Sequence, residues 1–416
     1  MIGAEARPTP CVLAVWNEVT PYRAHMMRRI AAEMPDVRLI HFFTHAVQDG
    51  SMPWQTDLPS GLDVRTDGAN RVPFGRYFHR QWRGLLRTIL GIVEQEQPNL
   101  VIVAGHGDLV RLMLLRHLRR RGVSVVHYSD ANVFGIATRS IPRDAVRLAY
   151  LRWVMRMPDA YMTMGTCGRA YYSLVGTRGK PLFAHPYEPD YGAIAQRDHV
   201  KEDAFCRRFG IQRSRRRFCC SARLVERKRV DVLLTAFIRS ASELPDWDLL
   251  IAGTGPLAAQ LQEMVPESLR DRVTFAGFLQ MEDVRTCYHV SDVLVHPSQF
   301  EAWALVINEA VACGLPVIAT SVTGAAVELV RHRVNGMLVP PGDVAALSRA
   351  MLHVAEPGRA ADMGRASLRV LSDWRAAADP VQGLREAIDY FTAADGRSRC
   401  TARTNSKVSR AHRCHE

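Results

Sequence analysis

Several features that would assign this chain to a class at once are missing. No apolar segment approaches the roughly 20 residues needed to cross a bilayer, and the longest, near Ala304, is interrupted by Asn308 and Glu309. A signal peptide is not expected, because Glu5 and Arg7 precede only a short apolar segment. The nine cysteines form no Cys-x-x-Cys pair, which disfavours a zinc or redox motif. These absences predict a cytoplasmic protein with reduced thiols.

Apolar residues are plentiful by contrast. They make up 47% of 416 residues, enough to fill two cores of about 150–200 residues each. Ten strand-like segments alternate with helical patterns such as 22–33, 80–97, 108–121 and 143–156. The predicted strands are 11–16, 37–43, 99–104, 123–128, 159–164, 216–221, 248–252, 272–276, 292–296 and 316–320. This alternation predicts an α/β fold with two Rossmann-like, doubly wound domains, each a parallel sheet covered by helices on both faces.

The net charge of +12 is concentrated in the first half of the chain. Residues 1–200 contain 25 Lys or Arg against 17 Asp or Glu, whereas residues 201–395 contain 23 against 24. Nucleic acid is not the expected partner, since no recognition helix, zinc finger or RNP-like motif accompanies the charge. The segment 107–121 interleaves arginines with leucines and fits two interpretations. It is either a contact with an anionic membrane surface or a solvated arginine face on a helix packed against a sheet.

The most informative motif is a pair of glutamates, Glu301 and Glu309, at either end of an apolar segment. Gly314 and Pro316 predict that a helix ends there, so the helix should run from about 304 to 313. Its first turn offers unpaired N–H groups, which suit a diphosphate. Eight residues span roughly 12 Å, so one acid could bind a sugar and the other a ribose. Alternatively, both are ordinary glutamates near a helix.

A basic loop precedes this motif by about 75 residues. The strand 216–221 predicts that Arg223 and Lys228 follow its carboxyl end, the edge at which open α/β sheets bind ligands. Arg223 could grip a phosphate with two hydrogen bonds, and Lys228 would add a compact charge. Taken alone, such a loop is more often a solvated basic turn.

Five blocks that include these motifs follow one another in a specific order: 223–230, 249–256, 273–278, 292–298 and 301–309. Together they resemble the C-terminal half of family 4 glycosyltransferases. The resemblance implies the GT-B fold, in which two Rossmann-like domains face each other across a cleft, and a retaining, metal-independent transfer from a nucleotide sugar. A cofactor other than the UDP- or GDP-sugar co-substrate is not implied.

The resemblance also implies roles for individual residues. Glu301, Arg223 and Lys228 would act at the reacting centre. His127 and Asp130, at the end of another strand, would either touch the acceptor or the sugar or have a structural role at the strand end. The donor would be bound by Gly253, Gly255, Gly277, Phe278, Leu279, Ala302, Trp303, Ala304, Leu305 and Glu309. Residues 21–23, Pro-Tyr-Arg, are similar to an acceptor-side loop of enzymes that build bacterial surface polysaccharides. The acceptor would be a glycan or a lipid-linked glycan at the inner face of the membrane.

The expected division of the chain follows from this resemblance. Residues 1–190 would bind the acceptor, 191–372 the nucleotide sugar, 373–395 would return to the first domain as a helix, and 396–416 would be a disordered basic tail.

The sequence departs from the family pattern at glycines. Where Glu-Gly-Phe-Gly is usual, Ala302 and Ala304 flank Trp303, and where Lys-Gly is usual, Arg229 follows Lys228. Each change adds a Cβ near the expected diphosphate. These changes leave open a non-catalytic scaffold of the same fold. Two enzymes that could share the architecture are further alternatives: a sugar-nucleotide epimerase and a retaining phosphorylase. The sequence 253–258 also fits a G-x-G-x-x-A dinucleotide fingerprint, but one weak match does not support NAD binding.

Overall fold

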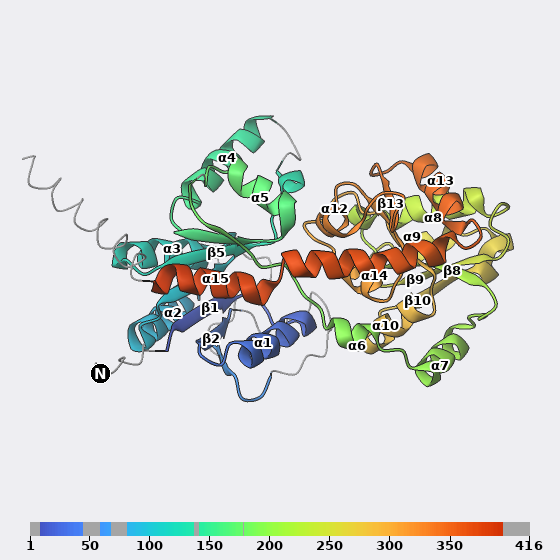
Figure 1. Ribbon diagram of the computed structural model, residues 1–416. Helices are drawn as coiled ribbons and strands as arrows, with labels where there is room; N and C mark the ends of the chain where they lie inside the picture. Colours follow the sequence, from blue (N-terminus) through green and yellow to red (C-terminus); the bar gives the residue numbers. More distant parts are fainter. Residues whose placement is uncertain (1–8, 45–58, 68–80, 137–140, 178, 394–416) are drawn as a thin grey trace, which may run out of the picture.

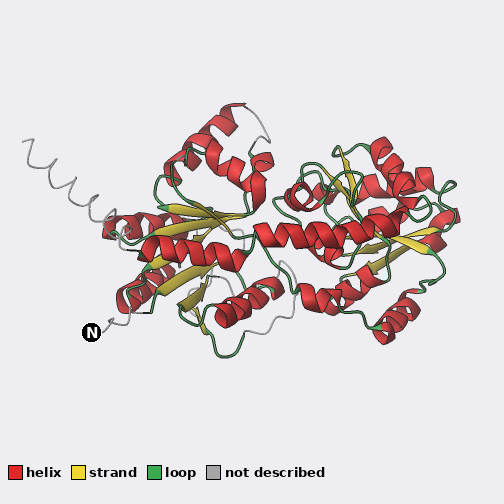
Figure 2. Ribbon diagram, in the orientation of Figure 1, coloured by secondary structure: helices red, strands yellow, loops and turns green. Residues whose placement is uncertain are grey.

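The computed structural model describes residues 9–44, 59–67, 81–136, 141–177 and 179–393, so the predicted tail 396–416 lies outside the described residues. Two parallel β-sheets stand side by side, each with helices on both faces (Figures 1 and 2). This arrangement confirms the α/β prediction of two doubly wound domains.

The first sheet has the order β3-β2-β1-β4-β5-β6-β7. Its strands are β1 (Cys11–Trp16), β2 (Arg38–Phe43), β3 (Asp63–Thr66), β4 (Leu100–Ala104), β5 (Val125–Ser129), β6 (Ala160–Thr163) and β7 (Leu182–Ala184). The helices of this domain are α1 (Pro21–Glu33), α2 (Trp82–Glu96), α3 (Leu109–Arg121), the short η1 (Val133–Gly135), α4 (Ile141–Val154) and α5 (Gly165–Leu174).

The second sheet repeats the same winding, with the order β10-β9-β8-β11-β12-β13. Its strands are β8 (Arg216–Ser221), β9 (Trp247–Ala252), β10 (Val273–Gly277), β11 (Val293–His296), β12 (Val317–Thr320) and β13 (Gly336–Val339). The helices around it are α6 (Tyr191–Ala195), α7 (His199–Phe209), η2 (Glu226–Lys228), α8 (Val230–Ser240), α9 (Ala258–Glu263), η3 (Glu267–Arg272), α10 (Met281–His289), α11 (Leu305–Ala312), α12 (Gly324–Leu329) and α13 (Val344–Ala355).

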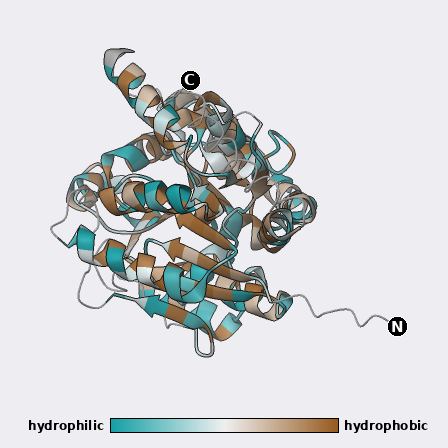
Figure 3. Cartoon of the chain, turned by 90° about the vertical axis from the view of Figure 1, so that its left-hand side faces the viewer, coloured by the Kyte–Doolittle hydropathy of each residue, from teal (hydrophilic) through white to brown (hydrophobic). Residues whose placement is uncertain are grey.

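All ten predicted strands are present, because each is a mainly apolar run of four to six residues that the fold buries wholly or in part. Figure 3 shows the strands as a mainly hydrophobic centre surrounded by helices that change from hydrophobic to hydrophilic around their surface. Strands β3, β7 and β13 were not predicted. They are short, and each lies at the edge of its sheet, where a strand needs less apolar character.

The chain crosses between the domains twice, and the crossings touch. After β7 it passes to α6, which packs against α11. It returns from α14 (Arg359–Ala377) to α15 (Pro380–Thr392), which packs against β7 and α1 (Figure 1). His185 Nδ1 donates to Pro380 O at 2.9 Å, and the buried Glu188 Oε1 accepts from Arg29 at 2.6 Å and from Arg375 at 2.8 Å.

Helix α3 resolves the two interpretations of the arginine-rich segment. Leu114, Leu115 and Leu118 are buried in the core, so the helix packs on the sheet and offers no apolar face to a membrane. Arg111 does not belong to the solvated face, since it is only 2% exposed. Its guanidinium donates to Ala104 O at 2.5 Å and to the side chain of Thr44 at 2.9 Å. Only the later arginines of α3 face solvent.

Candidate functional site

A cleft of about 450 Å³ lies at the carboxyl ends of the strands in the second sheet. Loops after β8, β9 and β10 form one wall, and Leu305, Val306 and Glu309 of α11 form another. Pro21 and Tyr22, at the start of α1, reach it from the first domain. The predicted residues that line this cleft are Arg223, Lys228, Gly253, Gly255, Phe278, Leu279, Leu305 and Glu309. Residues from four separate sequence blocks are thus brought together.

Two glycines allow the loops after β8 and β9 to pack back to back. A Cβ at Gly253 would lie 1.8 Å from Ala222 O, and one at Gly255 would lie 2.3 Å from Leu224 O. The close approach is fixed by a hydrogen bond of 2.9 Å from Leu224 N to Thr254 O. The G-x-G pattern is therefore explained by loop packing. Gly277 does not line the cleft, but its carbonyl supports the same loop by accepting from Gly253 N at 2.7 Å.

The two predicted cations differ in their surroundings. Arg223 is exposed and has no carboxylate partner among the described residues, so its guanidinium is available to a ligand. Lys228 Nζ lies 2.5 Å from Glu301 Oε1, and Arg227 Nη1 lies 2.8 Å from the same oxygen. Burial raises the pKa of Glu301, but the neighbouring charges of Lys228 and Arg227 outweigh it and hold the pKa below its usual value. Glu301 is therefore ionised beside the cleft.

Glu309 has the opposite electrostatic environment. It is 5% exposed, and burial raises the pKa of its carboxyl. The hydroxyl of Tyr288 donates to its Oε2 at 2.8 Å, while Oε1 has no partner among the described residues. One oxygen is thus fixed by the protein and the other is left to accept from a ligand in the cleft.

The amino end of α11 faces the same cleft. Its N-cap, Ala304, has φ 81° and ψ 79°, and no side chain caps the helix. The first N–H groups of α11 and the positive end of its dipole therefore remain for an anion. Arg229 is a second non-glycine residue with left-handed backbone, at φ 49°. Both positions are those at which the family resemblance leads one to expect glycine.

The side chain of Trp303 points away from the cleft. Its Nε1 donates to Asn308 Oδ1 at 2.9 Å, and its ring packs against Trp374. Asn308 in turn donates to the hydroxyl of Tyr191 at 2.9 Å. Ala302 also lies outside the lining. These contacts anchor the loop between Glu301 and α11, so any contribution of Ala302 and Trp303 to ligand binding comes from their backbone.

The first domain corrects one predicted contact. His127 is fully buried and lies between Tyr172 Oη, at 2.8 Å, and His106 Nδ1, at 3.2 Å. Burial lowers its pKa well below the usual value, so it is a neutral core residue that does not reach an acceptor. The partly exposed His106, which was not predicted, is the outer member of this pair.

Asp130 lies where the two domains approach each other. Its side chain is open to solvent on one side, while the surrounding walls reduce its hydration and raise its pKa. The charges that act on it include Arg23 of its own domain and Glu301 of the other. Its position agrees with an acceptor-side group, a role that stays a prediction.

Asn132 is a further residue that sequence reasoning missed. It follows β5 and is 3% exposed, and its Nδ2 donates to Glu301 O at 2.9 Å and to Ala302 O at 3.0 Å. A side chain of the first domain thereby holds the loop that carries Glu301. No local pattern around Asn132 signals a contact 169 residues away.

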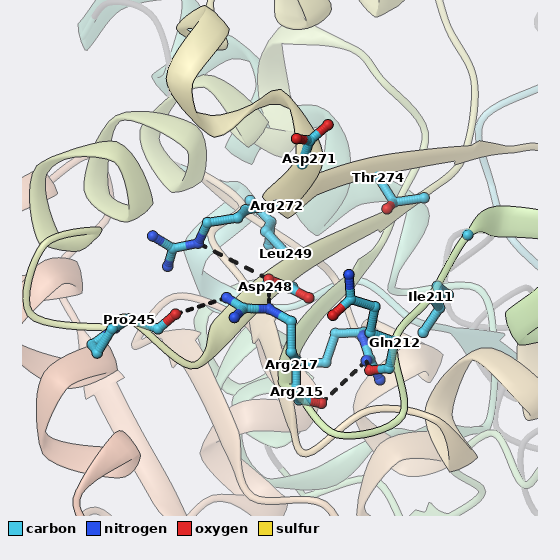
Figure 4. A pocket seen from close by; sticks show the side chains of 11 residues that line it. Ile211, Gln212, Arg215, Arg217, Pro245, Asp248, Leu249, Asp271, Arg272 and Thr274 are labelled. Atoms are coloured by element: carbon cyan, nitrogen blue, oxygen red, sulfur yellow. Dashed lines mark hydrogen bonds and ion pairs between the residues drawn. The ribbon is translucent and has the colours of Figure 1, made fainter.

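A second hollow, of about 220 Å³, lies at the opposite edge of the second sheet (Figure 4). Its lining includes Asp248, the second aspartate of the Asp-x-Asp sequence 246–248, a motif that binds Mg²⁺ in metal-using transferases. Asp248 Oδ1 lies 2.8 Å from Arg215 Nε, and Arg272 donates to Ala241 O at 3.0 Å and Trp247 O at 2.7 Å. Both arginines are therefore engaged in structural contacts. The Asp-x-Asp motif also lies far from the cleft.

Comparisons with known proteins agree with this geometry in the second domain. Residues 215–356 match the family described as "Glycosyl transferases group 1". An uncharacterized glycosyltransferase of Methanocaldococcus jannaschii is 33% identical over 138 residues, which are 33% of this chain and 35% of that protein. A GDP-mannose-dependent alpha-mannosyltransferase of Corynebacterium glutamicum is 38% identical over 117 residues, 28% of this chain and 26% of that protein. The chain thus matches about a quarter to a third of the length of these curated relatives.

The likeness to solved structures extends over both domains. Anabaena HepE, solved in complex with UDP and glucose, has a TM-score of 0.65 at 17% identity, covering 92% of this chain and 100% of that one. At this identity the likeness concerns the fold. Together with the two equally wound sheets, it shows that the chain has the GT-B fold.

Proposed function

We propose that this protein is a retaining glycosyltransferase that moves a sugar from a nucleoside diphosphate sugar to a hydroxyl of a glycan or lipid-linked acceptor. One observation carries the proposal: Arg223, Lys228, the buried Glu309 and the uncapped end of α11 converge on one cleft. Two cations and a helix N-terminus suit a diphosphate. A buried carboxylate with one free oxygen suits a ribose hydroxyl pair.

The same residues account for the chemistry of transfer. The bond between the anomeric carbon and the diphosphate oxygen breaks, and negative charge develops on the departing diphosphate. Arg223, Lys228 and the N–H groups of α11 stabilise that charge, in the role that Mg²⁺ has in metal-using enzymes. The acceptor hydroxyl attacks on the face that the diphosphate leaves, and its proton passes to a diphosphate oxygen. Glu301, held ionised by Lys228 and Arg227, orients the sugar.

The comparisons favour a donor of the UDP or GDP class. One relative is described as GDP-mannose-dependent, and one structural neighbour was solved with UDP. A relative from Erwinia amylovora, 31% identical over 142 residues, is described as an amylovoran biosynthesis glycosyltransferase. We extend this to a role in polysaccharide assembly at the inner face of the cell membrane. Among the described residues, no helix combines the length and apolar character of a membrane span.

The donor site is tested by thermal unfolding of the full chain with UDP, GDP, ADP and their sugars. We expect one nucleotide class to raise the Tm, since a ligand at 100 times its Kd stabilises by about 2.7 kcal/mol. Arg223→Ala and Lys228→Ala should each weaken that nucleotide by about tenfold or more, because each removes a charged phosphate contact.

Arg239→Ala, at an exposed position on α8 outside the cleft, is the matched control and should bind as the unaltered protein does. Wild-type affinity in both cleft variants would refute the donor site. A chain stabilised by none of these nucleotides would favour a scaffold.

A further inference from the structure

Helix α4 carries an unusual apolar stripe on its outer face. Val146, Tyr150 and Trp153 are 71%, 42% and 45% exposed, and their spacing places them on one side of the helix. The opposite side, with Leu151 and Val154, is buried. Four of the seven exposed large apolar side chains in the described part of the chain belong here, once Leu174 of the adjacent α5 is included. Isolated exposed apolar residues are ordinary, whereas such a cluster indicates an interaction surface.

Basic residues flank this stripe. On α4 and directly after it, Arg143, Arg147, Arg152 and Arg156 are exposed. The exposed Arg119 of α3 donates to Arg156 O at 2.7 Å, which joins the arginines of α3 to the same surface. Residues 109–180 contain 13 Lys or Arg against 3 Asp or Glu. We call the surface formed by these arginines and the apolar stripe of α4 the α4 face.

The α4 face adjoins the loop that carries Glu301. Arg147 Nη1 donates to Gly135 O at 2.9 Å. Gly135 lies against the ring of Phe300, so closely that a Cβ would come within 2.8 Å of it. A surface that contacted α4 would therefore lie beside the entrance between the domains, on the acceptor side.

We propose that the α4 face docks on an anionic lipid bilayer. An anionic bilayer is complementary to this surface in two ways. Its negatively charged headgroups can pair with the arginines, and the apolar layer beneath the headgroups can take up Trp153, Tyr150 and Val146. A nucleic acid would satisfy the charge but not the apolar stripe, and an apolar protein surface would leave the arginines unpaired. The inference adds a location to the proposed membrane association and does not depend on catalysis, because docking requires neither donor nor acceptor.

Co-sedimentation of the full chain with phosphatidylcholine vesicles, with and without phosphatidylglycerol, tests the proposal. We expect binding that requires phosphatidylglycerol and weakens as salt is raised. The double variant Tyr150→Ser, Trp153→Ser should lose about tenfold in partitioning, and Arg143→Glu with Arg156→Glu at least as much. Val334→Ser with Leu368→Ser removes two exposed apolar side chains elsewhere and should bind normally. Thermal unfolding checks that each variant is folded.

Fluorescence gives an independent readout of depth. Brominated lipids should quench the tryptophan emission of the bound protein, and Trp153→Phe should abolish most of that quenching without weakening binding by more than about twofold. Equal binding by the control and both α4 variants would overturn the proposal. Two further results would overturn it if the protein does not bind vesicles: a dimer that the α4 variants dissociate, or DNA binding that these variants abolish.

Discussion

Two residues next to lining residues of the cleft have a backbone conformation that suits glycine better. Ala304 and Arg229 have positive φ, and the family pattern leads one to expect glycine at both. The left-handed turn is therefore retained while the glycine is not. Both residues stand at helix ends: Ala304 caps α11, and Arg229 lies between η2 and α8 and forms an ion pair with Asp231 at 2.9 Å. The added side chains cost stability without removing the geometry on which the proposed donor site depends.

Ala304→Gly should consequently stabilise the protein. An L-residue with a Cβ loses about 1 kcal/mol in the left-handed region, so we expect a Tm rise of roughly 2 °C. Ala310→Gly, in the buried middle of the same helix, is the matched control and should lower the Tm, because there glycine loses helix propensity and packing. The idea fails if both changes move the Tm in the same direction.

Glu309→Gln should raise the thermal stability of the protein and lower its affinity for nucleotide. Burial raises the pKa of Glu309 above its unfolded value of 4.5, so ionisation destabilises the folded state once the pH exceeds about 4.5, and the protonated form does not. The amide keeps the Tyr288 contact and removes the buried charge. We expect a higher Tm than the unaltered protein at pH 7, with the difference disappearing below pH 4.5.

Nucleotide affinity should fall by about tenfold in the same variant, since a charged acceptor for the ribose is lost. Glu263→Gln, on an exposed face of α9, controls for the charge change. A variant that unfolded more readily at pH 7, or bound nucleotide as before, would contradict the role assigned to this residue.

The sequence indicated the charged residues of the candidate site better than the residues that hold them in place. Arg223, Lys228 and Glu309 could be predicted because each stands at a recognisable position next to a strand or helix. Tyr288 and Asn132 could not, because their roles depend on contacts that only the fold creates. His127 was misassigned for the same reason: its place at a strand end was read correctly, but not the side of the sheet on which it is buried.

At the scale of elements, the apolar pattern of the sequence predicted strands correctly where most of the strand is buried. The ten predicted strands are mainly apolar runs, whereas β3, with the sequence Asp-Val-Arg-Thr, has no such signal. The break between α14 and α15 was also missed. There Asp379 caps α15 and Pro380 occupies its first turn, yet helical periodicity continues across the break.

Gly383 is the contact that lets α15 lie on the first sheet. A Cβ there would come within 1.7 Å of Ala184 O, so Gly383→Ala should lift α15 from β7 and lower the Tm. Gly91→Ala, in the exposed middle of α2 with open space around it, should instead raise stability by up to about 1 kcal/mol. Unfolding curves of the two variants give the comparison, and an unchanged Tm for Gly383→Ala would show that α15 tolerates a shift.

At the scale of the whole molecule, Asn132 joins the first domain to the loop that carries Glu301. Asn132→Ala removes two buried hydrogen bonds to Glu301 O and Ala302 O, so the domains should separate more readily. We expect a larger radius of gyration in small-angle scattering and a roughly tenfold loss of nucleotide affinity.

The matched control is Gln382→Ala, which removes an exposed amide from α15 and should change neither quantity. If Asn132→Ala kept both the compact shape and the affinity, the contact would be incidental to ligand binding.

The two touching crossings between the domains have a mechanical consequence. Because His185 contacts Pro380 and Glu188 contacts Arg375, we expect both connections to act as a single hinge about which the two domains rotate. Displacement grows with distance from a pivot. A rotation would therefore leave the contacts at this hinge intact and change mainly the contacts between the domains that lie far from it, while each sheet keeps its own structure.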